Sequence, residues 1–191
     1  KEDLADFRFI GGDDKTPLKY HIEHADLINQ LIYVWVKLPT VSGGVNTEKF
    51  WLYYGNPTAV SAADPAGSFD PATAVAFHFS GGQSLPQDAT AYATPVSGFT
   101  GSLSNASLIA GGVIFTPGNR LTINDTPALA VAPDKGLTVS FWFKPQGDQA
   151  DAILFERSGG GASLQVGLRG TSIFSRYTTA AGTVFETAPA A

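Results

Sequence analysis

The sequence predicts an all-β protein built as an antiparallel β-sandwich, and three observations lead to this class. Short apolar runs recur along the chain, separated by turn residues that include 21 glycines and 12 prolines. Several runs alternate apolar and polar residues, as strands with one buried face do. Helical periodicity is nearly absent, and its best stretch, 23–30, is short and uncapped, so we expect a loop or a single turn there.

The most informative strand is predicted over 49–54, where the run Phe-Trp-Leu-Tyr-Tyr ends at Gly55-Asn56-Pro57. Large apolar residues at consecutive positions are typical of a strand buried on both faces. Glycine offers a left-handed conformation and proline fixes φ, so the strand must end there. We expect the aromatic side chains of this run, and Trp35, to pack in the core rather than to form a ligand platform.

Further strands are expected at 6–10, 19–23, 31–38, 74–79, 113–115, 120–123, 137–144, 153–156, 163–168 and 172–178. The run 31–38 is apolar on both faces, which favours a central position in its sheet. The runs at 113–115 and 120–123 flank a Pro117-Gly118 turn. The cleanest alternation is 137–144, where Leu, Val, Phe and Phe at every second position predict an inward face.

The chain divides at a segment rich in Ala, Ser, Asp, Pro and Gly, which is typical of a linker. We predict a small β domain over 1–60, a linker over 61–73 and a second β-sandwich over 74–191. The Ala-Pro tail at 188–191 is expected to fray.

Composition excludes some functions. With 12 basic and 17 acidic residues the net charge is −5, so there is no basic stripe for nucleic acid. The chain lacks cysteine, which excludes disulfides and thiolate metal sites. No apolar run approaches the ~20 residues of a membrane helix, so we expect no membrane contact within this segment. Because methionine is absent even at position 1, we expect a processed or trimmed chain.

Four pieces of the first block occur in an order that resembles a bacterial family of domains of unknown function, over roughly residues 4–60. They are Asp-Phe-Arg-Phe-Ile at 6–10, Pro-Leu-Lys-Tyr-His-Ile-Glu at 17–23, Val-Trp-Val-Lys-Leu-Pro at 34–39 and Trp-Leu-Tyr-Tyr-Gly-Asn-Pro at 51–57. Single pieces would be weak signals, whereas four in order are specific.

The second block resembles a concanavalin A-like jelly roll of the laminin-G type. The similarity rests on pieces at 76–79, 88–91, 111–115, 121–123 and 137–145, the last of which would be a central strand of that fold. The tandem is similar to the extracytoplasmic region of bacterial proteins with a MotA/TolQ/ExbB-type proton-channel domain. This resemblance implies a periplasmic or extracellular location and oligomers formed through the parent protein.

Both blocks are shorter than the resemblance implies, so we expect a fragment of a longer protein. A truncated sheet leaves unpaired strand edges, which are sites of association. In the alternative arrangement, which we slightly favour, the two blocks complete one merged sandwich, because a 60-residue block alone would have a thin core.

Catalytic signals are weak. The histidines are His21, His24 and His78, and they lack a Gly-x-Ser-x-Gly elbow, so we expect surface or core histidines rather than a Ser/His catalytic set. Glycan cleavage needs two carboxylates facing one sugar about 5–9 Å apart. Glu156 and Glu186 are isolated in their strands, and the Glu-x-Asp-x-x-Glu run of concanavalin-type hydrolases is missing.

A calcium site is a weaker hypothesis than simple loop capping. Hard cations take oxygen ligands from loops rich in Asp, Asn and Gly. The candidate ligands are Asp88, with Thr90 nearby, and the corner at Asn124 and Asp125. These residues also form Asx-turns without metal, and we favour that interpretation, which requires no cofactor.

Sugar binding would use exposed aromatic faces beside a few polar groups. Trp142 is predicted on the face opposite the apolar stripe of 137–143, where Tyr92, Arg169, Arg176 and Tyr177 are candidates to join it. The competing interpretation, which we prefer, packs Trp142 under a neighbouring sheet.

The sequence-based hypothesis is a non-catalytic extracytoplasmic binding region that contacts a glycan, a cell-wall component or an envelope protein. A glycan-cleaving jelly-roll hydrolase and a structural or assembly module without a small ligand are the alternatives.

Overall fold

The computed structural model describes residues 1–80, 85–131 and 135–187, and it confirms the all-β antiparallel class. The predicted frayed tail at 188–191 lies outside the described residues. The chain forms two compact units, unit 1 over Lys1–Thr138 and unit 2 over Val139–Ala191. The predicted division at 61–73 stays a prediction.

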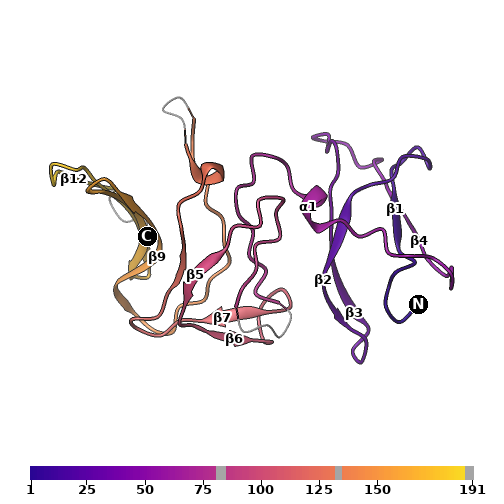
Figure 1. Cartoon of the computed structure of the whole chain (residues 1–191), viewed down its shortest axis with the longest axis horizontal. Coiled ribbons are helices and arrows are strands. Elements are labelled where there is room, and N and C mark those ends of the chain that lie inside the picture. Colours follow the sequence, from indigo (N-terminus) through magenta and orange to yellow (C-terminus); the bar gives the residue numbers. More distant parts are fainter. Residues whose placement is uncertain (81–84, 132–134, 188–191) are drawn as a thin grey trace. The chain divides into compact units, whose positions relative to one another are not determined.

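The first part of unit 1 consists of two small antiparallel sheets (Figure 1). One pairs β1 (Arg8–Ile10) with β4 (Trp51–Tyr53), and the other pairs β2 (Tyr20–Asp26) with β3 (Leu31–Val36). The core between them is formed by Phe9, Leu18 and Tyr20, against which further apolar side chains of β2 and β3 pack. Apolar burial at these alternating positions is the main force that holds the sheets together.

Two predictions about this region are wrong. The strand β4 is not buried on both faces, because Trp51 is 40 % exposed, Tyr53 49 % and Tyr54 75 %. Trp35 is also partly exposed, and β3 is not central, because it pairs only with β2 among the described strands. In a two-stranded sheet one face packs on the core and the other meets solvent, so the outward aromatic residues have no second layer. The predicted stop is confirmed by Gly55, whose φ is +101°.

The rest of unit 1 contains short elements: α1 (Pro65–Ser68), β5 (Val96–Phe99), β6 (Ser102–Ser104), β7 (Gly112–Ile114), β8 (Leu121–Ile123) and the 3₁₀ turn η1 (Pro127–Leu129). The strands pair as β5 with β8 and β6 with β7, so β7 and β8 flank the predicted turn without pairing to each other. The predicted strand at 74–79 is wrong. Only an isolated bridge joins Phe77 to Asp88, because the intervening chain is organised by turns.

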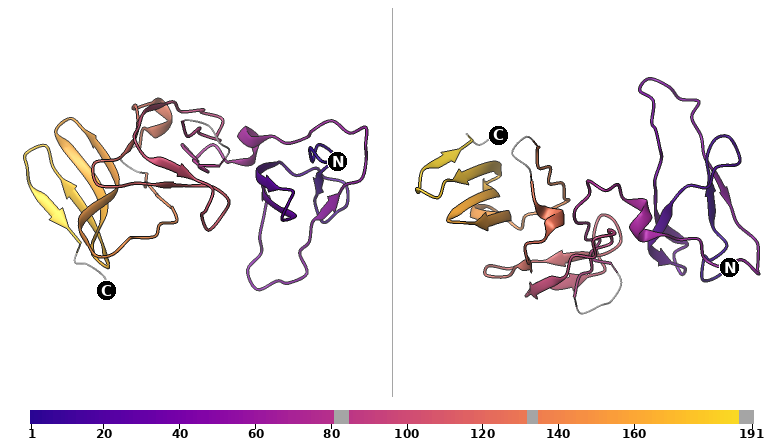
Figure 2. Two further views of the ribbon diagram at one scale, coloured as in Figure 1. Left: turned by 90° about the horizontal axis from the view of Figure 1, so that it is seen from below. Right: turned by 45° about the horizontal axis from the view of Figure 1, so that its top comes forward.

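Unit 2 is a four-stranded antiparallel sheet in the order β12-β11-β10-β9, which Figure 2 shows from two sides. Its strands are β9 (Gln149–Gly159), β10 (Ala162–Gly170), β11 (Ser172–Thr178) and β12 (Val184–Glu186). Phe174 is fully buried, and its ring packs on Gly167, where an added Cβ would stand 2.6 Å from the ring. The glycine is therefore required for this close approach.

The predicted strand at 137–144 is wrong. These residues form no strand, and Leu137, Val139, Phe141 and Phe143 are each about 40 % exposed rather than inward-facing. Alternation predicts which side chains share a face, but a strand also needs a neighbour to bond with, and the described residues supply none here.

Candidate functional site

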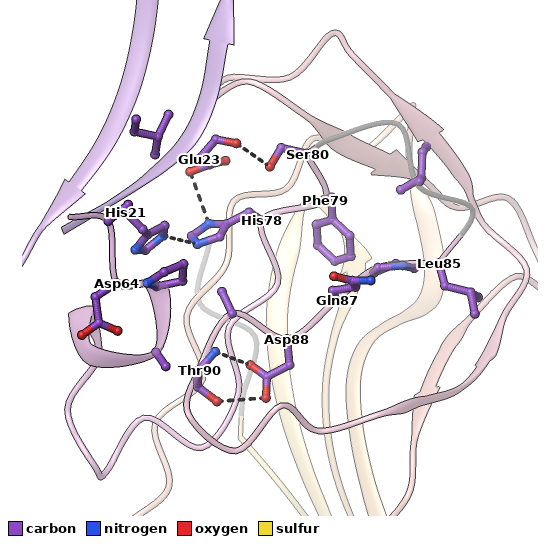
Figure 3. A pocket seen from close by; sticks show the side chains of 17 residues that line it. His21, Glu23, Asp64, His78, Phe79, Ser80, Leu85, Gln87, Asp88 and Thr90 are labelled. Atoms are coloured by element: carbon purple, nitrogen blue, oxygen red, sulfur yellow. Dashed lines mark hydrogen bonds and ion pairs between the residues drawn. The ribbon is translucent and has the colours of Figure 1, made fainter. Parts of the chain in front are cut away.

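A cleft of about 510 Å³ in unit 1 is the candidate functional site (Figure 3). Its walls come from β2, from α1 and the residues before it, and from the segments 78–80 and 85–90. Three carboxylates and two histidines line it, and no lysine or arginine does so among the described residues. The apolar part of the lining includes Phe79, Leu85 and Leu103.

The cleft wall carries a chain of three side chains, Glu23, His78 and His21. Nδ1 of His78 lies 3.2 Å from the Glu23 carboxylate, and Nε2 of His78 lies 2.9 Å from Nε2 of His21. Figure 3 shows His78 between its two partners. The carboxylate also accepts a hydrogen bond from the indole N–H of Trp35, so its position is fixed from two sides.

The positions of these groups follow from the local fold. On β2 the side chains alternate between faces, and a register shift between Ile22 and His24 interrupts the pairing with β3 next to Glu23. His78 and Ser80 lie in the same segment. This segment is attached to β2 because the hydroxyl of Ser80 donates a hydrogen bond to the Glu23 carbonyl oxygen at 3.0 Å. A β-strand and a turn-rich segment therefore hold the three groups together.

Burial sets the charge of the two histidines. Desolvation, reinforced by repulsion from His78, lowers the pKa of His21 to about 4. Burial also lowers the pKa of His78, although the nearby Glu23 carboxylate opposes this shift. Both imidazoles are thus neutral near pH 7.

The hydrogen-bond network assigns the protons on these rings. In neutral His78, Nδ1–H donates to Glu23, so Nε2 must accept, and His21 donates to it from Nε2–H. The remaining nitrogen, Nδ1 of His21, is buried and has no hydrogen-bond partner within the described residues. Both nitrogens of His78 are therefore occupied, and Nδ1 of His21, at the end of this row of three side chains, is not exposed to solvent.

The far wall of the cleft is stabilised by Asp88, a candidate calcium ligand for which a loop cap was the favoured interpretation. Its carboxylate accepts hydrogen bonds from the backbone N–H groups of Ala76, Thr90 and Thr94 and from the Thr90 hydroxyl, at 2.8–3.0 Å. Burial opposes ionisation of Asp88, but these bonds outweigh it and lower its pKa. This is the geometry of a loop cap.

The other predicted calcium ligands lie apart from this wall. Asn124 and Asp125 are exposed directly after β8. Across the part of the chain that the structure describes, no group of three or more His, Cys, Asp or Glu residues is arranged to hold a metal ion.

Of the predicted sugar-binding residues, the structure brings together only the two arginines. Arg169 and Arg176 flank the ring of Phe174, at 5.0 and 4.9 Å, and each pairs with both Asp151 and Glu186. The hydrogen bond from Arg169 is the main cause that lowers the pKa of Asp151 to about 2. Sequence reasoning missed these two carboxylates as partners, because only the register of the sheet places them beside the arginines.

The remaining predicted ligand residues have contacts of their own or none with this pair. Tyr177 follows Arg176 and so points to the opposite face of the sheet, where it stacks on Phe185 at 6.5 Å. Trp142 is 78 % exposed and lies outside the strands of unit 2, so the preferred interpretation that packs it under a neighbouring sheet is wrong. Tyr92 belongs to unit 1, where its hydroxyl donates to the carbonyl oxygen of Pro71 at 2.6 Å.

The pairing of His21 with His78 was not predicted. The signal in the sequence was the placement of both histidines in apolar alternating runs, which indicated buried positions without indicating a shared one. Fifty-seven residues separate them, so only the tertiary fold brings their rings together.

Comparison with known families gives one match. A family model described as Domain of unknown function (DUF2341) matches residues 3–90, just under half of the chain. The match agrees with the resemblance noted for the first block and extends past it, so that Glu23, His21 and His78 all lie inside it. Searches of curated proteins and of solved structures gave no match. Among the described residues, no helix has the length and apolar character needed to span a bilayer.

Proposed function

We propose that this chain is a non-catalytic extracytoplasmic binding region of a larger bacterial envelope protein, and that the cleft beside β2 holds its ligand. The ligand is a glycan, a cell-wall component or a segment of a protein partner. One observation carries this proposal: the polar groups of the cleft bond to one another instead of forming a nucleophile and a base. Ser80 donates to a carbonyl oxygen, and both nitrogens of His78 are occupied.

The composition of the cleft supports a binding role. Ligand pockets combine apolar walls with a few fixed polar groups that orient the ligand. Here Phe79, Leu85 and Leu103 supply apolar surface, and Glu23 is held rigidly by Trp35 and His78. The lining disfavours an anion, because none of its described residues is cationic and it carries Glu23 and Asp88, whereas the third carboxylate, Asp64, is paired with Lys19 at 2.7 Å.

Finer parts of the proposal rest on sequence resemblance. They are a periplasmic or extracellular location, a concanavalin A-like second block over 74–191 and a parent protein of the MotA/TolQ/ExbB proton-channel type. The match to a domain of unknown function supports the first block alone. The parent protein would supply the membrane domain and any oligomeric assembly.

The alternative of a glycan-cleaving hydrolase has one observation in its favour, the carboxylate–histidine–histidine chain on a cleft wall. Its free nitrogen is buried, which separates it from a substrate in the cleft. The paired carboxylates in unit 2 fit the role less well. A glycosidase acid needs a raised pKa, whereas the arginines lower the pKa values of Asp151 and Glu186.

Trp35 provides a direct test, because its indole binds Glu23 and its ring lies 5.4 Å from that of His78. Replacing the other two tryptophans, Trp51→Phe and Trp142→Phe, leaves one reporter beside the cleft. We expect a saturable change in its fluorescence on titration with soluble peptidoglycan fragments or N-acetylated chitohexaose.

Two matched variants locate the binding. Ala66→Phe adds a ring on the exposed wall of the cleft and should weaken binding at least tenfold. Ala72→Phe, at an exposed position outside the lining, should have no effect. A fluorescence response that is unchanged in Ala66→Phe, or no response to either probe, would contradict glycan binding in the cleft.

A further inference from the structure

The outer face of the β1–β4 sheet carries exposed aromatic rings that the cleft does not use. The register pairs Ile10 with Trp51 and Arg8 with Tyr53, so these four side chains share the face opposite Phe9 and the core. Trp51 is 40 % exposed and Tyr53 is 49 % exposed. Trp51 and Tyr53 are two residues apart on one strand, so their Cα atoms lie about 7 Å from each other and their rings form one surface.

Polar groups of both signs border these rings. The ammonium of Lys49 lies 4.7 Å from the centroid of the Trp51 ring, and the hydroxyl of Tyr53 donates to the carboxylate of Asp14 at 2.5 Å. The turn that carries Asp14 is held against this strand because Gly12 approaches the backbone of Lys49, where an added Cβ would stand 2.8 Å from the carbonyl oxygen. The backbone thus fixes one side of the surface.

We infer that this surface, formed by Trp51, Tyr53, Lys49 and Asp14, is a second binding site and that its ligand is a neutral polysaccharide. Flat sugar faces stack on exposed aromatic rings, and sugar hydroxyls both donate and accept hydrogen bonds. Such a ligand matches rings bordered by Lys49 and Asp14. The other cation on this face, Arg8, donates its guanidinium N–H groups to the carbonyl oxygens of Ala5, Phe7 and Val60.

Other ligand classes fit this border less well. A purely apolar partner would desolvate Asp14 and Lys49 without pairing them, and that burial is unfavourable. An anionic polymer would meet the Asp14 carboxylate and a chain of net charge −5. The contact of Lys49 with Trp51 is no obstacle, because a cation–π contact at an exposed site is weak and the lysine side chain is flexible.

The site lies outside the cleft lining, so this inference does not depend on the cleft. Isothermal titration with cellohexaose and N-acetylated chitohexaose tests it, with polygalacturonate as the anionic probe, and it is done on the Ala66→Phe chain so that the blocked cleft does not contribute. We expect Trp51→Ala and Tyr53→Ala each to weaken binding of a neutral probe at least tenfold. Tyr53→Phe keeps the ring and should weaken it only about threefold. Trp142→Ala, which removes another exposed tryptophan, should leave this binding unchanged.

A second measurement uses the unmodified chain and so avoids any variant that fails to fold. Bound cellohexaose or chitohexaose should protect Trp51, but not Trp142, from oxidation by N-bromosuccinimide, as located by peptide mass spectrometry. Three results would overturn the inference: no binding of either neutral probe to the Ala66→Phe chain, a preference for polygalacturonate, or binding to the Ala66→Phe chain that survives Trp51→Ala. If binding is lost in Ala66→Phe but retained in Trp51→Ala, the cleft proposal stands and this one fails.

Discussion

Asp88→Ala is expected to destabilise unit 1 by about 3 kcal/mol. The Asp88 carboxylate accepts four hydrogen bonds, and two of the backbone donors belong to Thr90 and Thr94, which are only 4 % and 3 % exposed. A buried N–H left without a partner costs about 1–3 kcal/mol, and water reaching the more open Ala76 end offsets part of the loss. Asp88→Asn should cost about 1–2 kcal/mol, because its amide keeps one acceptor oxygen but turns a donor toward Thr94.

The assay is urea denaturation in a Trp142→Phe background, where emission comes from Trp35 and Trp51, both in unit 1. With a slope of about 2 kcal/mol/M, the midpoint of Asp88→Ala should fall by about 1.5 M. Asp70→Ala is the matched control. Asp70 also accepts from three local donors, those of Ala72 and Thr73, but all of them are exposed, so the expected loss is below about 1 kcal/mol. Equal midpoint shifts in Asp88→Ala and Asp70→Ala would refute the reasoning.

Three further predictions concern the titration of His21, the close approach at Gly167 and the response to calcium. Because the pKa of His21 falls from 6.5 to about 4 on folding, the unfolded chain binds this proton more tightly. The folded state therefore has its full stability above pH 6.5, and its free energy of unfolding falls by about 2 kcal/mol as the pH drops toward 4. Thermal melts from pH 4 to 8 should show this slope, and His21→Phe should flatten it whereas His24→Gln should not. Gly167→Ala should destabilise unit 2 by about 2 kcal/mol, because the new Cβ meets Phe174 and the carbonyl oxygen of Ala152. The control Gly159→Ala, which has open space around it, should leave the stability unchanged. Thermal melts followed by circular dichroism measure both. Millimolar calcium should leave the melting temperature unchanged, because protein donors already occupy the Asp88 carboxylate.

The sequence predicted strands well where alternation and pairing coincide. The strand β11 has the predicted bounds, Ser172–Thr178, and β2 and β10 extend the predicted runs by a few residues. The error at 137–144 arose because periodicity identifies a shared face without identifying a neighbouring strand. The error at β4 arose because consecutive aromatic residues predict burial only where a second layer covers the outer face.

The candidate site was less predictable than the fold. Individual histidines and Asp88 were recognised, but the contact between His21 and His78 depends on two segments that meet only in the tertiary structure. The loop cap at Asp88 was the favoured interpretation over calcium, since an Asx-turn is a local arrangement that sequence reveals. Arg169 and Arg176 were predicted as ligand residues beside Trp142 and not as a cluster, and their carboxylate partners Asp151 and Glu186 required the register of the sheet.

One experiment on peptidoglycan fragments shows whether the cleft beside β2 holds a ligand without cleaving it. Binding is measured by isothermal titration, and the fragments recovered from the same sample are weighed by mass spectrometry. We expect saturable binding that Ala66→Phe weakens at least tenfold and Ala72→Phe does not, with every fragment recovered at its original mass. Fragments cleaved in the presence of the chain, or binding that is indifferent to Ala66→Phe, would contradict it.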